Sequence, residues 1–177
     1  MNYCSHCSAR LDVLIQKGDD RPRQVCPDCG RIHYVNPKLV VGSIPEWEGR
    51  VLLCKRAIEP RLGKWTLPAG YLEAGETVEA GARRETLEEA QARLGSIEPY
   101  ALFNLSFVNQ IYLMFRARLI DGRFGIGEES LAVELFEERD VPWDQLAFTV
   151  MEKTLRRYFS DRQTGQFPFR IGNISPD

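Results

Sequence analysis

Three acids crowd together in the segment PAGYLEAGETVEAGARRETLEEAQA, which covers residues 68–92. On a helix, Glu85, Glu88 and Glu89 fall within an arc of about 100°, and Glu85 and Glu89 stack one turn apart. Like charges at this spacing repel, and the helix dipole disfavours negative charge near a C-terminal end. Arg84 can pair with Glu88, which leaves Glu85 and Glu89 without a helical partner. A local rule broken without a local gain indicates a functional site.

Divalent metal ions would reconcile these charges. Carboxylate oxygens suit Mg²⁺ or Mn²⁺, and several carboxylates on one rigid face can hold more than one ion. Mg²⁺ usually keeps water ligands and binds substrate phosphates as well. The alternative is a solvated acidic face of a helix with no further role.

A second group of residues that could bind a metal ion consists of four cysteines in the pattern C-x2-C-x18-C-x2-C. They are Cys4, Cys7, Cys26 and Cys29. This spacing is typical of a tetrahedral zinc site, and four thiolates close the coordination sphere, so the zinc would be structural. Residues 1–36 are too few to build an adequate core, and zinc would supply the missing folding energy. A disulfide pair or a redox motif is the alternative, which the doubled knuckle and an expected reducing compartment disfavour.

Other residues near the cysteines have simpler interpretations. His6 and His33 could replace a cysteine ligand, although two surface histidines are the simpler reading. Basic residues of this segment are offset by acids, which favours a solvated face over an RNA-binding patch. The fifth cysteine, Cys54, lies in the apolar run VLLCKR and is expected to be a buried small hydrophobe.

The elements that must position these groups follow from apolar periodicity. We predict a helix from Thr77 to about Leu94, with Thr77 as N-cap and Gly95 just beyond the end. A second helix is predicted from Thr149 to Asp161, and a hairpin turn at Glu48-Gly49. Strands are predicted in LVVGSI, VLLCKR, YALFNLSF, QIYLMFRARL and LAVELF. This order of strands and helices predicts an α/β domain with a mixed sheet.

Bulk composition limits the class of protein. The chain has 177 residues with a net charge of −2 and 44% hydrophobic residues, enough for one main domain and a small appendage. The charge gives no case for nucleic acid or an anionic membrane surface as partner. No leader-like apolar region opens the sequence, and no apolar run reaches the length of a membrane span, so a cytoplasmic protein is expected.

The acidic segment has a recognisable full-length pattern. It reads G-x5-E-x7-R-E-x2-E-E and resembles the Nudix hydrolase signature, G-x5-E-x7-R-E-U-x-E-E-x-G-U, where U is a bulky aliphatic. Two positions depart, because Thr86 stands where an aliphatic is usual and Gln91 where glycine is usual. Thr86 affects helix packing and Gln91 the helix exit, so neither removes a metal ligand. The matching positions are Gly70, Glu76, Arg84, Glu85, Glu88 and Glu89.

This resemblance implies a fold and a set of ligands. The family fold is an α/β/α sandwich on a mixed β-sheet, here covering residues 37–177 after a zinc ribbon at residues 1–36. By resemblance, Glu85 and Glu89 would be the principal metal ligands. Glu88 would be a further ligand or would hold a metal-bound water.

The resemblance also assigns supporting roles around these ligands. Arg84 would orient the carboxylates, and Glu76 would brace the loop or touch a metal. Ala69 and Gly70 form the mouth of the loop, and the Ala69 carbonyl would be an extra ligand.

The chemistry implied is hydrolysis of a nucleoside diphosphate joined to another group. Bound metal neutralises the diphosphate and activates a water, so that two phosphomonoesters form without a covalent intermediate. The general base would be Glu88 or an acid of the later loop GIGEES, where Glu128 or Glu129 is the candidate. An ordinary acidic loop is the alternative there.

A zinc ribbon followed by a Nudix domain resembles the arrangement of two branches of the family. The bacterial NADH pyrophosphatase and RNA de-NADing group carries the motif S-Q-P-W-P-F-P-x-S after the signature, and this sequence lacks it. The segments NPKLVVGS, GRVLLCKRAIEP and GKWTLPAGYLEAGET resemble the branch of plant chloroplast FAD and ADP-ribose diphosphatases and their bacterial relatives. Further matches to this branch are Glu129-Ser130-Leu131, Leu135-Phe136 and Leu146-Ala147-Phe148.

The second resemblance implies FAD, cleaved to FMN and AMP, or ADP-ribose, cleaved to AMP and ribose 5-phosphate. One alternative is a pyrophosphatase for NADH, capped RNA or another nucleotide. The other is a zinc-ribbon protein that binds nucleotide or nucleic acid without hydrolysis. A homodimer is also expected, because dimers are common in relatives that hydrolyse ADP-ribose.

Substrate recognition is assigned to a wider set of residues. Arg56 and Arg61 could contact phosphate or ribose, a solvated arginine being the alternative, and Asn109 and Gln110 could contact a substrate edge. Ring stacking needs aromatic faces, with core packing as the alternative for most of them. The candidates are Trp47, Trp65, Tyr71, Phe103, Phe107 and Tyr112.

Overall fold

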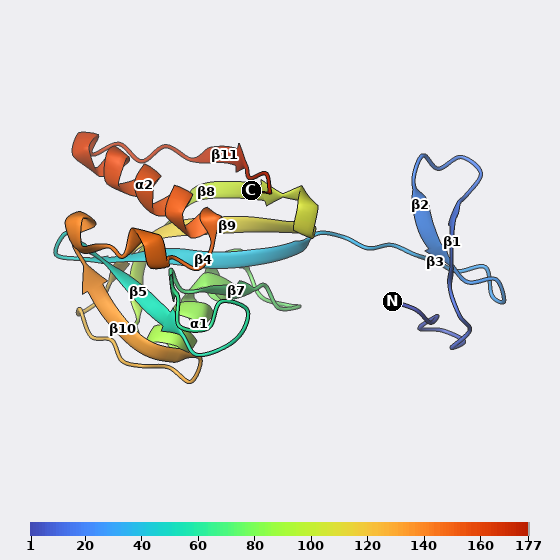
Figure 1. The fold of residues 1–177 in the computed structure, drawn as a ribbon, viewed down its shortest axis with the longest axis horizontal. Coiled ribbons are helices and arrows are strands. Elements are labelled where there is room, and N and C mark those ends of the chain that lie inside the picture. Colours follow the sequence, from blue (N-terminus) through green and yellow to red (C-terminus); the bar gives the residue numbers. More distant parts are fainter. Residues whose placement is uncertain (177) are drawn as a thin grey trace. The chain divides into compact units, whose positions relative to one another are not determined.

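A computed structural model describes residues 1–176 of the chain (Figure 1). It divides into two compact units, an N-terminal unit of Met1–Asn36 and a main unit that begins at Pro37. None of the helices in the described part of the chain is both long and apolar enough to cross a membrane.

The N-terminal unit is a three-stranded antiparallel sheet in the order β1-β2-β3. Its strands are β1 (Asp12–Ile15), β2 (Pro22–Val25) and β3 (Ile32–His33). The hydrophobic cluster beneath them contains only Cys4, Leu11 and Cys26 as buried members. Two of these three are cysteines of the C-x2-C knuckles, so the sulfur cluster itself forms most of this small core.

The main unit is built on one mixed sheet of eight strands. The order is β10-β5-β4-β9-β8-β11, with β6 beside β5 and β7 beside β4. β4 pairs with β9 in parallel, as β8 does with β11, and the other pairings are antiparallel. The strands are β4 (Lys38–Trp47), β5 (Arg50–Arg56), β6 (Trp65–Thr66), β7 (Ala69–Tyr71), β8 (Leu94–Leu105), β9 (Gln110–Leu119), β10 (Ser130–Phe136) and β11 (Arg170–Asn173).

Two strands of this sheet separate and make room for the loop that precedes the acidic helix. β4 and β5 pair only beside their turn, where Glu46 faces Val51 and Trp47 faces Arg50. Further along, β6 takes the free edge of β5 and β7 takes the free edge of β4. The chain between β5 and the acidic helix is therefore wedged into the sheet.

The two α-helices cover opposite faces of the sheet (Figure 1). Helix α1 is Val78–Ala90 and helix α2 is Thr149–Thr164, and three short 3-10 turns complete the unit: η1 (Ser106–Val108), η2 (Glu138–Asp140) and η3 (Trp143–Gln145). Alternation along β4 sends its side chains to both faces, because successive residues of a strand point opposite ways. Val41 packs with Ala82 of α1, and Ile44 belongs to the cluster that includes Leu155 of α2.

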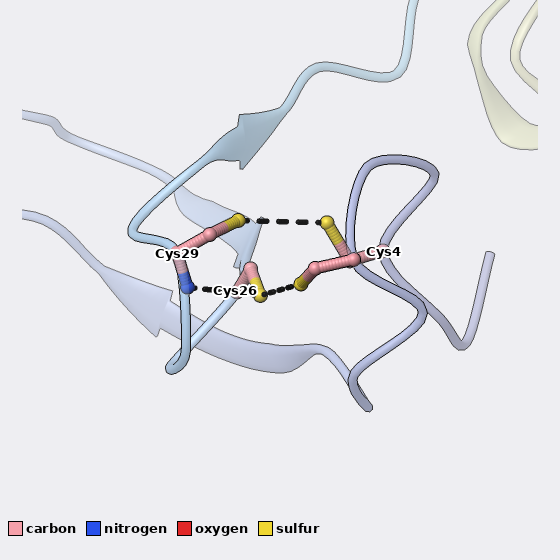
Figure 2. A group of neighbouring side chains, drawn as sticks. Cys4, Cys26 and Cys29 are labelled. Carbon is pink, nitrogen blue, oxygen red and sulfur yellow. Dashed lines mark hydrogen bonds between the residues drawn. The ribbon is translucent and has the colours of Figure 1, made fainter.

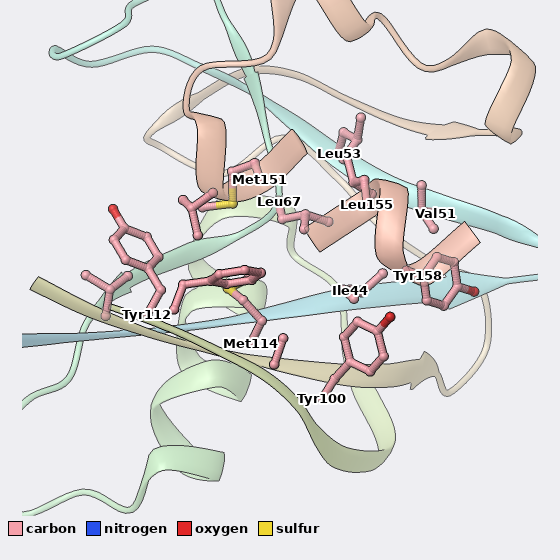
Figure 3. Packing of buried hydrophobic residues seen from close by; sticks show 14 of the residues in the cluster. Ile44, Val51, Leu53, Leu67, Tyr100, Tyr112, Met114, Met151, Leu155 and Tyr158 are labelled. Carbon is pink, nitrogen blue, oxygen red and sulfur yellow. The ribbon is translucent and has the colours of Figure 1, made fainter. Parts of the chain in front are cut away.

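The largest core cluster lies between the sheet and α2. Figure 3 shows Ile44, Val51 and Leu53 of the sheet facing Leu155 and Tyr158 of the helix. Burial of such side chains contributes about 1.5–3 kcal/mol each. This apolar layer holds the sheet rigid beneath the loop and helix that carry the acids.

The predicted α/β class with a mixed sheet is confirmed, and so is the turn at Glu48-Gly49. Both turn residues have positive φ, at 48° and 77°, as a two-residue type I′ hairpin requires. The predicted end of the first helix was wrong, because α1 ends at Ala90 and Leu94 already begins β8. Gln91 takes the left-handed conformation that we assigned to Gly95.

The end of α2 and strand β11 also differ from the expectation. Helix α2 runs three residues beyond Asp161 to Thr164, where Gly165 in a left-handed conformation ends it. Strand β11, Arg170–Asn173, was not foreseen. Its four residues RIGN show no clear alternation, and its pairing partner β8 lies far away in sequence.

Candidate active site and zinc site

Gly70 brings the wedged loop into contact with the acidic helix. It lies in β7, and a Cβ atom at this position would overlap the carboxylate of Glu85. Only glycine allows this close approach, which explains the glycine that opens the signature. The loop then crosses to Thr77, whose side chain accepts a hydrogen bond from the Ala80 amide at 3.2 Å and caps α1, confirming the predicted N-cap.

Arg84 binds several carboxylates at once. Its guanidinium donates to Glu76 at 2.8 Å, to Glu85 at 2.6 Å and to Glu88 at 3.0 Å. A further bond at 3.1 Å reaches the Tyr71 carbonyl of β7. The expectation that Glu85 lacks a partner was therefore wrong, because Arg84 reaches its neighbour in sequence as well as the residue one turn away.

Glu76 ties the loop to the helix. Its carboxylate accepts from the Glu73 amide at 2.8 Å while it receives two bonds from Arg84. The guanidinium of Arg84 lowers the pKa of Glu76, so this acid stays ionised and holds the loop.

Glu89 is the acid that the protein leaves without a cation. The residue is 7% exposed and makes no ion pair among residues 1–176. Burial, followed by the charge of Glu85, raises the pKa of Glu89 to about 8, and burial also raises the pKa of Glu85. Two buried carboxylates that repel each other fit a hard divalent cation, which prefers oxygen ligands.

The loop that holds the predicted general base lies against the same helix. The Gly127 amide donates to the Glu89 carbonyl at 3.1 Å, and Glu128 and Glu129 follow directly. The charge of Glu129 contributes to the raised pKa of both Glu85 and Glu89. Acids far apart in sequence therefore line the same cleft.

The cleft itself has a volume of about 1160 Å³. Its lining includes the acids of α1 and of the 127–129 loop. Its lining also includes aromatic and apolar side chains, here called the aromatic wall: Ile58, Tyr71, Phe107, Tyr112, Phe148 and Ile174. Such a cleft can hold both a charged group and a flat ring.

The predicted recognition residues divide into two sets. Arg56 and Arg61 line the cleft, with Arg56 donating to the Pro60 carbonyl at 2.9 Å and lying 5.3 Å from the Phe148 ring centroid. Gln110 also lines the cleft and donates to the Tyr71 hydroxyl at 2.9 Å.

The second set lies outside the described lining of the cleft: Trp47, Trp65, Phe103 and Asn109. Trp65 and Phe103 belong to the main hydrophobic core, which was the alternative given for most of the aromatics. Phe148, just before α2, and Ile174, after β11, were not foreseen as cleft residues. Phe148 lies in the Leu146-Ala147-Phe148 match to the FAD and ADP-ribose diphosphatase branch, which was the available signal, whereas no motif marks Ile174.

Both departures from the Nudix signature have a structural reason. Thr86 is fully buried, and its hydroxyl lies 2.7 Å from the Ser43 hydroxyl of β4 and donates to the Ala82 carbonyl at 2.8 Å. A polar pair thus replaces an apolar contact beneath α1. Gln91 has φ 48° and ψ 28°, a left-handed conformation that glycine adopts most easily.

The four cysteines of the N-terminal unit meet around one point (Figure 2). Their sulfur atoms lie within 4.8 Å of one another, with 3.7 Å between Cys4 and Cys29 and 3.4 Å between Cys7 and Cys26. A tetrahedral zinc with Zn–S bonds of about 2.3 Å requires sulfur separations near 3.8 Å, so the cluster fits zinc.

The histidines do not enter this four-cysteine cluster. The His33 ring nitrogen Nε2 lies 3.3 Å from the Cys4 sulfur, and the His6 amide donates to the same sulfur at 3.4 Å. Both therefore contact a thiolate ligand from outside. Cys54, as predicted, is a buried residue of the main unit.

Comparison with known proteins identifies the family. The NUDIX domain model matches residues 37–161, and the model described as Nudix N-terminal, a zinc ribbon, matches residues 2–35. The chain belongs to the Nudix family and has a zinc ribbon of the Nudix N-terminal type before its NUDIX domain. The fold and the recognition of the signature are thereby confirmed.

Several relatives have known structures or named activities. The crystal structure of a NUDIX hydrolase from Nitrosomonas europaea is 51% identical, with a TM-score of 0.96 over 99% of this chain and 100% of that one. The ADP-ribose pyrophosphatase of Methanocaldococcus jannaschii is 31% identical over 71% of this chain and 75% of its own length. The NAD-capped RNA hydrolase NudC of Chromobacterium violaceum is 30% identical over 68% of this chain and 43% of its own length. The chain thus spans about half the length of the NudC proteins that it matches.

Proposed function

We propose that this protein hydrolyses the diphosphate of ADP-ribose or FAD and releases AMP. The observation that carries the proposal is one cleft that is lined both by the acids of α1 and the 127–129 loop and by the aromatic wall. A diphosphate that joins an adenosine to a second ring or sugar likewise combines a charged group with flat rings. The similarity to an ADP-ribose pyrophosphatase over three quarters of that protein, and the lack of the NADH motif, support this substrate class.

The proposed roles of these acids follow from burial and pairing. Glu85 and Glu89 would hold Mg²⁺ or Mn²⁺, with Glu88 as a more exposed third carboxylate. The bound cation would neutralise the diphosphate and supply an activated water. Arg84 holds Glu85 and Glu88 in place from the side, and the backbone of Ala69 donates a hydrogen bond that favours the ionised form of Glu89.

The proposed base is Glu129. Its position beside two metal-binding acids would let it accept the proton that the attacking water loses. Glu88 is the second candidate, but one of its carboxylate oxygens is already engaged by Arg84 at 3.0 Å.

The aromatic wall would hold the rings of the substrate. The hydroxyl of Tyr71 is fixed by Gln110, and the Lys38 ammonium lies 4.7 Å from the Tyr71 ring centroid. A ring held from two sides is prepared to stack at little entropic cost. Arg56 and Arg61 would contact the phosphates or the ribose.

The second candidate substrate class is NADH or NAD-capped RNA. Similarity to several NudC proteins favours it, including one from Pseudomonas aeruginosa that is 26% identical over 90% of this chain and 54% of that protein. Both candidates use the same acids and differ only in the group that the aromatic wall must receive.

The test is a substrate panel with a matched pair of variants. ADP-ribose, FAD, NADH and NAD-capped RNA are incubated with the protein and Mg²⁺ or Mn²⁺, and AMP release is measured. Glu89→Gln should lower turnover by about 100-fold or more. Glu79→Gln makes the same chemical change at an exposed position of the same helix and should leave turnover unchanged.

The outcomes separate the candidates. Preferred turnover of ADP-ribose or FAD, lost in Glu89→Gln, supports the proposal. Preferred turnover of NADH or capped RNA replaces it with the second candidate. No turnover of any compound by the wild-type protein contradicts both and favours a binding role.

Homodimer formation is part of the same proposal. One chain has a mass of 20.3 kDa, so light scattering after size-exclusion chromatography distinguishes the two states directly. A measured mass of a single chain at micromolar concentration would contradict a stable dimer.

A further inference from the structure

The C-terminal end of α1 is capped by a loop from elsewhere in the chain. The last carbonyls of a helix have no partners within it and must find them outside. The Gly125 amide donates to the Ala90 carbonyl at 2.8 Å, and the Gly127 amide donates to the Glu89 carbonyl at 3.1 Å. The segment 125–127 therefore supplies the cap that the helix lacks.

The side chain of Gln91 completes this attachment. Its amide nitrogen Nε2 donates to the Ile126 carbonyl at 2.8 Å, so the same three-residue segment receives and donates bonds. A glycine at this position, as in the usual signature, would give the same left-handed backbone but no side-chain bond. Gln91 thus accepts an unfavourable φ of 48° and contributes a contact that glycine cannot make.

Close approach explains the two glycines of the loop. A Cβ atom on Gly127 would overlap the Glu88 carbonyl of α1, and one on Gly125 would lie 2.6 Å from the Gln91 side-chain oxygen. Neither glycine has a left-handed φ, so the requirement comes from contact with the helix end and not from the backbone conformation. The loop is packed against α1 as tightly as the backbone allows.

The attachment continues directly into the predicted base. The Ser130 amide donates to the Gly127 carbonyl at 3.1 Å, which closes a turn that contains Glu128 and Glu129. On the other side, the Ala57 amide donates to the Glu129 carbonyl at 2.8 Å. These backbone bonds therefore fix the position of Glu129 relative to the helix that carries Glu85 and Glu89.

We propose that Gln91 and the segment 125–127 form a clasp that sets the position of Glu129 relative to the metal-binding acids. Gln91 is then a positioning residue of the reaction, acting through Glu129 without touching the substrate. The inference rests on the proposed function in one respect, since it assigns Glu129 a part in the hydrolysis.

The first experiment measures the clasp without any substrate. In Gln91→Met the side chain keeps its length but loses the donor, and the exposed Ile126 carbonyl can bond to water. Hydrogen exchange at the Gly125 and Gly127 amides should accelerate about five-fold, the effect of one neutral hydrogen bond. Gln145→Met is the matched control, because Gln145 is exposed and its side chain makes no hydrogen bond within residues 1–176.

The second experiment asks whether Gln91 acts through Glu129. Gln91→Met should lower kcat about five-fold with KM nearly unchanged. In a Glu129→Gln background the same substitution should have no further effect, because two residues acting through one another are not additive. Both backgrounds are measured with the whole 177-residue chain in the presence of Mg²⁺.

Each outcome decides the proposal. Unchanged exchange at both glycines overturns the clasp, and an equal loss of kcat in both backgrounds overturns the link to Glu129. Full activity of Glu129→Gln overturns the same link while the proposed function stands. If the wild-type protein turns over none of the substrates, the proposed function fails, and exchange at Gly125 and Gly127 alone then supports or overturns the clasp.

Discussion

Two regions of the molecule gather groups that repel one another when ionised, and they are built in opposite ways. The N-terminal unit gathers four thiols, and Cys4 and Cys26 are two of its four buried hydrophobic residues, beside Leu11 and Val25. The main unit gathers its carboxylates on a helix that rests on a large sheet with an extensive core on the α2 face. In the N-terminal unit, the cysteines that would bind the ion also form much of the core. In the main unit, the core is formed by other residues, and the carboxylates are not part of it.

This difference separates two uses of a metal ion. Zinc bound by the cysteines would contribute directly to the folding of Met1–Asn36, because little else holds that unit together. A cation between Glu85 and Glu89 would relieve repulsion that an independently stable fold already tolerates. The carboxylate site is therefore expected to reduce stability when it is empty, as sites shaped for reaction commonly do.

The largest expected effect is on the N-terminal unit. Cys26→Ser should abolish tight zinc binding, whose free energy is on the order of 10 kcal/mol for such sites, and unfold residues 1–36. Zinc per chain is measured by atomic absorption, and unfolding by limited proteolysis. Cys54→Ala is the control and should keep one zinc per chain. A Cys26→Ser protein that retains a full equivalent of zinc would contradict the four-cysteine site.

The second expected effect lies in the main unit, where ionisation of Glu89 lowers the free energy of unfolding. Because burial raises the pKa of Glu89 from 4.5 to about 8, the native state keeps a proton that the unfolded chain has already released. In protein dialysed free of Mg²⁺, the free energy of unfolding should therefore fall as the pH rises between these two values. The total change should be about 1–3 kcal/mol.

Glu89→Gln tests this directly, since the amide cannot ionise. Urea unfolding at about pH 5.5 and about pH 8 should show a smaller difference in the variant than in the wild type. The exposed control Glu79→Gln should behave as the wild type does. An equal pH dependence in Glu89→Gln would show that another group is responsible.

A third, smaller effect concerns a buried polar network away from the cleft. The Tyr100 hydroxyl donates to Asp161 at 2.8 Å, and Asp161 also receives a bond at 2.9 Å from Arg170. Tyr100→Phe should lower the free energy of unfolding by about 1–2 kcal/mol and leave turnover unchanged. Urea unfolding and AMP release are the measurements, and a large loss of turnover would show that this network is coupled to the cleft.

The smallest effect is a gain in stability at the β4–β5 hairpin. Glu48 adopts φ 48° in a type I′ turn, a conformation that asparagine adopts more readily. Glu48→Asn should raise the free energy of unfolding by about 0.5 kcal/mol, because the ion pair to Arg50 is exposed and contributes little. Gly49→Ala at φ 77° should destabilise instead, and identical thermal midpoints for the two variants would count against the turn assignment.

The sequence could predict those parts that depend on local pattern. The strand in QIYLMFRARL, the turn at Glu48-Gly49 and the N-cap at Thr77 all require only neighbouring residues, and each is confirmed. The end of α1 was missed because the left-handed residue is Gln91, whose conformation is fixed by a loop more than 30 residues away. Strand β11 was missed because its only support is a distant parallel partner.

The same limit applies to the candidate site. Spacing alone brought Glu85, Glu88 and Glu89 to attention, since all three share one helix face. Sharing of Arg84 among three acids could not be predicted, because it depends on the side-chain geometry of a loop that is wedged between β4 and β5. The aromatic wall could be predicted only in part. Tyr71, Phe107 and Tyr112 were among the ring-stacking candidates and line the cleft, but the sequence could not separate them from Trp65 and Phe103, which lie in the core.

The central strand β4 has a consequence for how the protein folds. Its longest pairing is parallel to β9, and Lys38 lies beside Gln110, about 70 residues later in the chain. Pairings between such distant segments form slowly, because a long loop must close before any contact is gained. During synthesis, Val40, Val41 and Ile44 therefore remain without their main partners until β9 has emerged. The strand at the centre of the finished sheet is therefore made well before its longest partner, and during this interval its apolar side chains are exposed to aggregation.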